Sequence, residues 1–288
     1  MSQHTYGVRS SVADLARVAV RRPLVGGPAV VAEYENAHWQ TPDVEALAKQ
    51  HAAFVATLRS LGCDVAEFEP VPGLPDAVFV YDPVFVIPSG SVQLRAAKAA
   101  RAGEGDRLIA DLESVGVPTI GQLVGDATAD AGDMYWMDED TVAIGRGYRT
   151  NQEAVDQMRG ILASDGVAVE VYDLPHDMGP EYCLHLMSVI SPVREDLAVV
   201  YEKLAPVAML QSLARRGIEW VVVDDEEYVT LGCNILAVRP GVVVMGERNV
   251  RTADKLRAKG VEVHTFDSEQ SDKGEGGPTC MTRPILRV

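Results

Sequence analysis

Short apolar runs alternate with segments of helical spacing along the whole chain. In the segment 43–62, Val44, Leu47 and Phe54 recur at helical spacing, and Gly62 stands where the helix would end. Similar patterns predict five helices in all, at about 43–62, 94–115, 150–164, 202–216 and 249–259.

Paired apolar runs separate these helices and predict β-hairpins. Four pairs are consecutive in the chain and a fifth would join the termini: 76–80 with 84–87, 133–136 with 141–144, 184–190 with 197–200, 234–238 with 242–245, and 281–286 beside 17–20. Single strands are predicted between helix and hairpin at 65–68, 167–171, 220–223 and 261–265.

This sheet-plus-helix unit recurs five times, at a spacing of about 50 residues. One unit alone cannot bury its apolar face, and closure into a ring removes open sheet edges. We therefore predict an α/β fold in which five units form a closed circular array. Long linkers are missing from the sequence, so we expect a single domain spanning 1–288.

Composition and charge limit the kinds of binding partner that the protein is expected to have. The chain has 47% hydrophobic and 24% charged residues, the balance of an ordinary soluble protein. It shows no signal peptide, and no apolar run approaches the roughly 20 residues that span a bilayer. We therefore expect a cytoplasmic protein with no membrane partner. The formal net charge of −16 opposes nucleic-acid binding. It would favour a cationic small molecule, although an acidic surface also simply keeps a protein in solution.

The four cysteines lie far apart, at positions 63, 183, 233 and 280. Without a Cys-x-x-Cys pair they predict neither a structural zinc site nor a disulfide framework. Cys63 is expected in a helix-to-strand connection, and Cys183 is expected to point away from the face that His185 occupies.

Chemically unusual residues stand at the start of each predicted inner strand, where they would face the centre of the ring. They are Asp76 with Asp82, Asp130 with Asp133, His185, Cys233 with Asn234, and Cys280. Any one of them could be a strand cap or a turn former. Acids, a histidine and a cysteine at one centre instead indicate an active site.

Cys280 is the candidate nucleophile, because Gly276-Gly277-Pro278 precede it and suit a tight approach of the backbone. A reactive thiolate needs a lowered pKa and a partner for proton transfer. His185, on a predicted buried strand, is the best candidate partner, and His176 is the next. The alternative is that Cys280 is a small buried hydrophobe and His185 a core residue.

Five segments resemble the guanidino-group-modifying, or pentein, superfamily, which includes dimethylarginine dimethylaminohydrolases, arginine deiminases and amidinotransferases. They are Pro75 to Asp82, Asp130 to Asp133, Gly145 to Asn151, Leu184 to Ser188, and Gly276 to Thr282. The resemblance covers nearly the whole chain. It implies a five-bladed α/β propeller with pseudo-five-fold symmetry.

The resemblance also implies roles for single residues. Cys280 would attack the guanidinium carbon, and His185 would protonate the departing amine and then activate water. Asp82 and Asp130 would hold the guanidinium nitrogens, with Asp130 also expected to reach His185. Nothing in this cycle needs a metal or an organic cofactor.

For an amino-acid substrate, the resemblance points to further side chains. Asp76 would contact the amino group, with strand capping as its structural alternative. Arg149 would bind the carboxylate together with one basic residue of 95–101, for which we take Arg101. Both arginines could instead be surface salt-bridge partners, the 95–101 group on a solvated helix face.

Two departures leave the subfamily open. Asp130 stands at a position where the family usually has Glu, although amidinotransferases also have Asp there. His185-Leu186-Met187 replaces the His-x-Asp of deiminases and transferases, which favours a dimethylarginine-hydrolase-like pocket, whereas the ending Cys280-Met281-Thr282 is closer to deiminases and transferases.

We expect a hydrolase that converts arginine or an N-substituted arginine to citrulline plus ammonia or an alkylamine. An amidinotransferase is the first alternative, and a non-catalytic pentein binding protein is the second. The sequence leaves the oligomeric state open, a homo-oligomer included.

Overall fold

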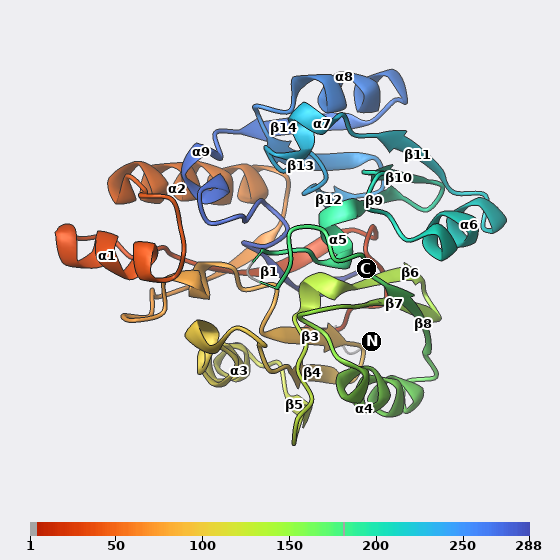
Figure 1. Ribbon diagram of the computed structural model, residues 1–288, viewed down its shortest axis with the longest axis horizontal. Helices are drawn as coiled ribbons and strands as arrows, with labels where there is room; N and C mark the ends of the chain where they lie inside the picture. Colours follow the sequence, from red (N-terminus) through yellow and green to blue (C-terminus); the bar gives the residue numbers. More distant parts are fainter. Residues whose placement is uncertain (1–4, 181) are drawn as a thin grey trace.

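Five three-stranded sheets are arranged around a common centre in the computed structural model, which describes residues 5–180 and 182–288 (Figure 1). The longer helices lie on the outer rim of this ring and the one-turn helix α5 lies near its centre. The predicted five-bladed α/β propeller is thereby confirmed.

The blades share one topology. In each, an antiparallel pair of strands is extended by a third strand that runs parallel to the middle one. The blades are β1 (Leu15–Arg21), β2 (Asp64–Phe68) and β15 (Arg283–Arg287); β3 (Val84–Ile87), β4 (Gly90–Gln93) and β5 (Thr119–Gln122); β6 (Met134–Asp138), β7 (Thr141–Arg146) and β8 (Ala168–Asp173); β9 (Ile190–Arg194), β10 (Leu197–Val200) and β11 (Glu219–Val222); and β12 (Leu236–Arg239), β13 (Val242–Gly246) and β14 (Glu262–Phe266).

Helices provide the crossovers to the parallel strands, as expected for parallel pairing. They are α2 (Val44–Ser60), α3 (Glu104–Ser114), α4 (Gln152–Ala163), α6 (Val207–Arg215) and α8 (Val250–Ala258). Asp43 and Asn151 cap the first turns of α2 and α4 by accepting backbone N–H bonds, which fixes where these helices begin. The remaining short elements are α1 (Pro28–Asn36), α5 (Leu186–Val189), α7 (Asp225–Tyr228), α9 (Glu269–Asp272) and the 3-10 turns η1 (Pro75–Val78), η2 (Ala99–Arg101) and η3 (Ala131–Asp133).

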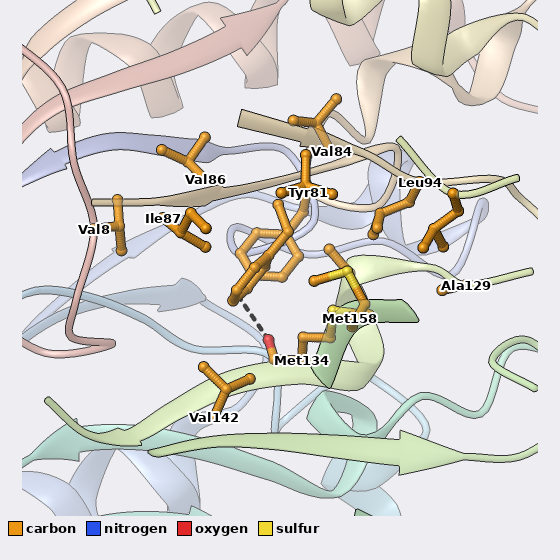
Figure 2. Packing of buried hydrophobic residues seen from close by; sticks show 14 of the residues in the cluster. Val8, Tyr81, Val84, Val86, Ile87, Leu94, Ala129, Met134, Val142 and Met158 are labelled. Atoms are coloured by element: carbon orange, nitrogen blue, oxygen red, sulfur yellow. Dashed lines mark hydrogen bonds between the residues drawn. The ribbon is translucent and has the colours of Figure 1, made fainter. Parts of the chain in front are cut away.

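The ring is closed by the two ends of the chain. β15 pairs antiparallel with β1, with Val18 opposite Pro284, as the sequence pattern predicted. Inner strands such as β3 are buried along their whole length. Val84, Val86 and Ile87 belong to the same buried hydrophobic cluster as Tyr81, whose hydroxyl donates to the carbonyl of Met134 over 3.2 Å (Figure 2).

The prediction of a hairpin between 76–80 and 84–87 is wrong. Pro75 starts the 3-10 turn η1, and the partner of β3 is β4 instead. The tight connection uses Gly90 at φ 150°, where an added Cβ would lie 2.5 Å from the Pro118 carbonyl oxygen. Apolar content alone could not separate a buried turn from a strand.

Two further local predictions are wrong. The segment 94–115 is not one helix, because Gly103 takes φ 93° and separates η2 from α3. His185 does not lie on a strand but precedes the helix α5, and β9 begins only at Ile190. Among the residues that the structure describes, no helix is long and apolar enough to cross a membrane.

Candidate active site

The turns that lead into the inner strands meet around one cavity of about 280 Å³. Six of the seven predicted site residues line it: Asp76, Asp82, Arg101, Arg149, His185 and Cys280. The seventh, Asp130, is 1% exposed and lies 3.2 Å from the His185 ring. Residues up to 204 positions apart in the sequence are thus brought to one place, Asp76 and Cys280 being the extremes.

His185 is held between carboxylates. Its Nε2 lies 3.2 Å from Asp130 Oδ2, and its Nδ1 lies 3.9 Å from Asp82 Oδ1. Burial disfavours the imidazolium, but the sulfur of Cys183 and the carboxylates of Asp82 and Asp130 together hold the pKa of His185 well above its usual value. The ring is therefore suited to donate a proton at neutral pH.

The backbone around His185 is fixed by polar contacts. Its N–H donates to Ser188 Oγ over 3.0 Å, and the next amide, of Leu186, donates to Asp133 Oδ1 over 2.8 Å. The other oxygen of Asp133 accepts from the Thr150 hydroxyl over 2.6 Å. Asp133 is thus the anchor of the histidine turn, a role that sequence reasoning did not assign.

A glycine is required beside the histidine. A Cβ on Gly132 would lie 2.2 Å from His185 Nδ1 and 2.9 Å from Asp82 Oδ1. The Gly132 N–H also donates to Asp82 Oδ1 over 3.0 Å. This position therefore lets the imidazole and the carboxylate approach each other.

Cys280 lines the cavity, and its sulfur accepts a hydrogen bond of 3.0 Å from Asn234 Nδ2. Asn234 Oδ1 in turn accepts from the backbone N–H of Thr279 over 3.0 Å. Burial, reinforced by the charge of Asp82, raises the pKa of the Cys280 thiol to about 11. The sequence placed Asn234 at a strand start but gave no sign that it would contact this sulfur.

The two glycines before Cys280 permit close packing. A Cβ on Gly276 would lie 2.0 Å from the Phe79 ring, and one on Gly277 would lie 2.7 Å from the Asn234 side chain. The tight backbone approach expected from Gly276-Gly277-Pro278 is thus observed.

Cys183 lies on the opposite side from the one expected. Its sulfur is 3.5 Å from His185 Nδ1, and it lines the same cavity as Cys280. The prediction that it points away assumed strand alternation, whereas this segment is an irregular connection before α5. His176, the second histidine candidate, instead pairs with the Tyr148 hydroxyl over 2.6 Å at an exposed position.

Arg101 is buried in an ion pair rather than on a solvated face. Its guanidinium donates to Asp82 Oδ2 over 2.6 Å and contacts Glu104 Oε2 at 2.7 Å. Burial opposes its charge, but Glu104 and Asp82 outweigh burial and raise the pKa of Arg101 well above its usual value. The side chain expected to bind a substrate carboxylate therefore occupies one oxygen of Asp82.

Other charged groups face the same cavity. Arg149 lies 3.7 Å from Asp130 Oδ2. Asp76 accepts from Trp39 Nε1 over 2.6 Å and pairs with Lys98 at 3.0 Å. Trp39, which stacks on Phe79 with ring centroids 5.3 Å apart, is a lining residue that the sequence pattern did not reveal.

Known proteins match this chain either over part of its length or over nearly all of it. The arginine deiminase family model matches residues 212–287. The N(G),N(G)-dimethylarginine dimethylaminohydrolase of Pseudomonas aeruginosa is 26% identical over 86% of this chain and 91% of that protein, and the uncharacterized protein YkgA of Bacillus subtilis is 26% identical over 99% and 97%. The arginine deiminase of Rhodococcus erythropolis is 28% identical over 56% of this chain, but the match spans only 47% of that enzyme's length.

Solved structures extend the fold comparison to almost the full chain. Dimethylarginine dimethylaminohydrolase from Pseudomonas aeruginosa, complexed with citrulline, superposes with a TM-score of 0.79 at 23% identity and covers 96% of this chain and all of that one (100%). The N-terminal domain of ArgZ, a cyanobacterial arginine dihydrolase, superposes with a TM-score of 0.79 at 20% identity over 94% and 97%. At these identities the superpositions show the fold alone. Together with the sequence relatives, the five-bladed ring supports the resemblance of the chain to the guanidino-group-modifying, or pentein, superfamily.

Proposed function

We propose that the protein is an amidine hydrolase that cleaves a C–N bond of the guanidinium of arginine or an N-substituted arginine. The observation that carries this proposal is that Cys280 and His185 line one cavity together with acidic side chains. A thiol, a protonated imidazole and carboxylates are the groups that attack, proton transfer and cation binding require. The sequence relatives named arginine deiminase and dimethylarginine dimethylaminohydrolase support the same chemistry.

Binding would use the charges that surround the cavity. Asp82 and Asp130 would hold the substrate guanidinium, which must compete with Arg101 for one oxygen of Asp82. Arg149 would attract the α-carboxylate, with Arg101 as the further cation once it is displaced from Asp82. Asp76 would face the α-ammonium group.

The first half-reaction would form a covalent intermediate. The substrate guanidinium bound beside Cys280 would lower the pKa of the thiol, because a positive charge favours the thiolate, and the thiol proton would pass to solvent. The thiolate then bonds to the guanidinium carbon, and the C–N bond to the leaving nitrogen breaks as His185 gives that nitrogen a proton.

The second half-reaction would release citrulline. Water attacks the amidino-thioester carbon while His185 takes a proton from the water. The C–S bond then breaks and Cys280 leaves as thiolate. The net change is one water consumed and one amine released.

Product analysis tests the proposal. The purified chain is incubated with L-arginine and with asymmetric dimethylarginine, and the products are identified by mass spectrometry. We expect citrulline, with ammonia or dimethylamine, from the native protein and from Cys63→Ala, whose cysteine lies outside the cavity lining, and no turnover from Cys280→Ala. Ornithine would indicate amidino transfer, and inertness toward every guanidine together with an unreactive Cys280 would support a binding protein.

A further inference from the structure

A second cavity of about 220 Å³ adjoins the first one across the catalytic pair. Of the residues that the structure describes, five line both cavities: Tyr182, Cys183, His185, Glu275 and Cys280. Cys280 and His185 thus lie at the junction of two spaces rather than at the end of one.

The two spaces differ in chemistry. The first is lined by ions of both signs, including Asp76, Lys98 and Arg149. The second adds a largely apolar lining of Met178, Met187, Tyr228, Val229 and Leu231.

The mouth of the second cavity keeps apolar surface exposed. Met178 is 62% exposed and Val229 is 77% exposed, although both are apolar. Among the described residues of this lining, the charged side chains are Asp177 and Glu275, besides His185. An apolar wall with acidic groups fits an amine that carries an apolar substituent.

Glu275 ties the shared wall together. It takes φ 62°, a conformation that non-glycine residues rarely adopt, and its Oε2 accepts the backbone N–H of Cys183 over 3.3 Å. This hydrogen bond fixes the backbone of Cys183, a residue that lines both cavities. The wall shared by the two cavities is therefore held by a specific hydrogen bond.

We propose that the second cavity is the subsite for the leaving amine, and that the preferred substrates are Nω-alkylated guanidines whose apolar substituent is larger than methyl. This rests on the proposed function, since it requires Cys280 to attack the guanidinium carbon. The amino-acid end would occupy the charged cavity, and the substituted nitrogen would lie at the junction, where His185 can protonate it. The departing alkylamine then leaves along the apolar wall.

A chain-length series tests the subsite. We measure kcat/KM for L-arginine and for its Nω-methyl, Nω-ethyl and Nω-propyl derivatives. Burial of each added methylene predicts a rise of about fourfold per carbon. A constant or falling kcat/KM along the series overturns the proposal.

Variants test whether the apolar lining of the second cavity causes the rise of kcat/KM with alkyl length. Met178→Glu and Val229→Asp place charge on exposed positions, and each should lower the ratio of propyl to unsubstituted kcat/KM by about tenfold. Val207→Asp, at a 70% exposed valine outside both cavities, is the matched control and should keep the native ratio. Unchanged ratios in both wall variants would overturn the assignment.

Alkylation of Cys280 separates this proposal from the proposed function. 2-Chloroacetamidine and its N-propyl derivative are compared by the rate of adduct formation at Cys280. A propyl advantage that Val229→Asp removes supports the subsite even when no guanidine is hydrolysed, in which case the proposed function alone fails. Hydrolysis of guanidines with no alkyl preference in either assay refutes the subsite and leaves the proposed function intact.

Discussion

The side-chain amide of Asn234 donates a hydrogen bond of 3.0 Å to the sulfur of Cys280. Burial raises the pKa of this thiol to about 11, and the Asn234 bond acts in the opposite direction. The pair thus joins two blades at the nucleophile, since Asn234 precedes β12 and Cys280 precedes β15.

Asn234→Ala should make Cys280 less reactive, because a hydrogen bond to sulfur favours the thiolate. We expect alkylation by iodoacetamide at pH 8 to slow by about tenfold, the size of a hydrogen bond to a charged group. Mass spectrometry of the Cys280 peptide measures the rate. Asn36→Ala, on the exposed end of α1, should leave it unchanged. Equal rates in Asn234→Ala and the native protein would show that the bond does not tune the thiol.

Cys183→Ser should lower the pKa of His185, because the Cys183 sulfur is one of the groups that hold it up. A histidine with a raised pKa keeps its proton until the pH rises through that pKa. If protonated His185 is the general acid, the alkaline limb of kcat/KM therefore moves to lower pH in the variant. Cys63→Ala, outside the lining of both cavities, serves as control. A limb that stays in place would refute the link between the two side chains.

Gly132→Ala should strongly lower activity without unfolding the protein, because the new Cβ would lie 2.2 Å from His185 Nδ1. Loss of a general acid predicts a fall in kcat of about 10²- to 10⁴-fold. Gly160→Ala, in α4 with nothing within 4 Å of the added Cβ, should keep full activity and gain up to about 1 kcal/mol of stability. Circular dichroism and turnover assays distinguish displacement of His185 from unfolding.

Asp133→Ala should destabilise the fold, because it removes the acceptor for the Leu186 N–H and the Thr150 hydroxyl. An unsatisfied buried donor costs about 1–3 kcal/mol in the free energy of unfolding. Urea denaturation measures the loss. The exposed pair of Asp173 with Arg146 offers a control, since Asp173→Ala should cost less than about 1 kcal/mol.

The same carboxyl predicts a pH dependence of stability. Burial raises the pKa of Asp133 to about 6, above its unfolded value of 3.8. The folded state therefore binds more protons, and the free energy of unfolding should fall as pH rises from about 4 to about 6. Asp133→Ala should reduce this slope, and an unchanged slope would assign it to other groups.

Arg149→Ala should weaken binding of the amino-acid end of a substrate. We expect KM for arginine to rise by about tenfold or more, as for loss of a charge-assisted hydrogen bond. Turnover of methylguanidine, which lacks a carboxylate, should change far less. Arg146→Ala, an exposed neighbour, is the control, and equal effects on both substrates would refute the assignment.

The five-fold repeat of strands and helices was predictable from sequence because it depends on local periodicity. The pairing of β1 with β15 followed from the same count, since a ring of five units requires both ends of the chain in one blade. The polar residues before the inner strands were also visible, because Asp82, His185 and Cys280 interrupt otherwise apolar runs.

Tertiary structure alone decided how these side chains meet. Asn234 and Cys280 are 46 positions apart, and Arg101 and Asp82 are 19 apart, so no local period relates either pair. Cys183 was misplaced because an irregular connection, unlike a strand, does not alternate its side chains between two faces. The second cavity, too, is formed by loops of different blades, whose packing is set by contacts such as the bond from Cys183 to Glu275 rather than by sequence pattern.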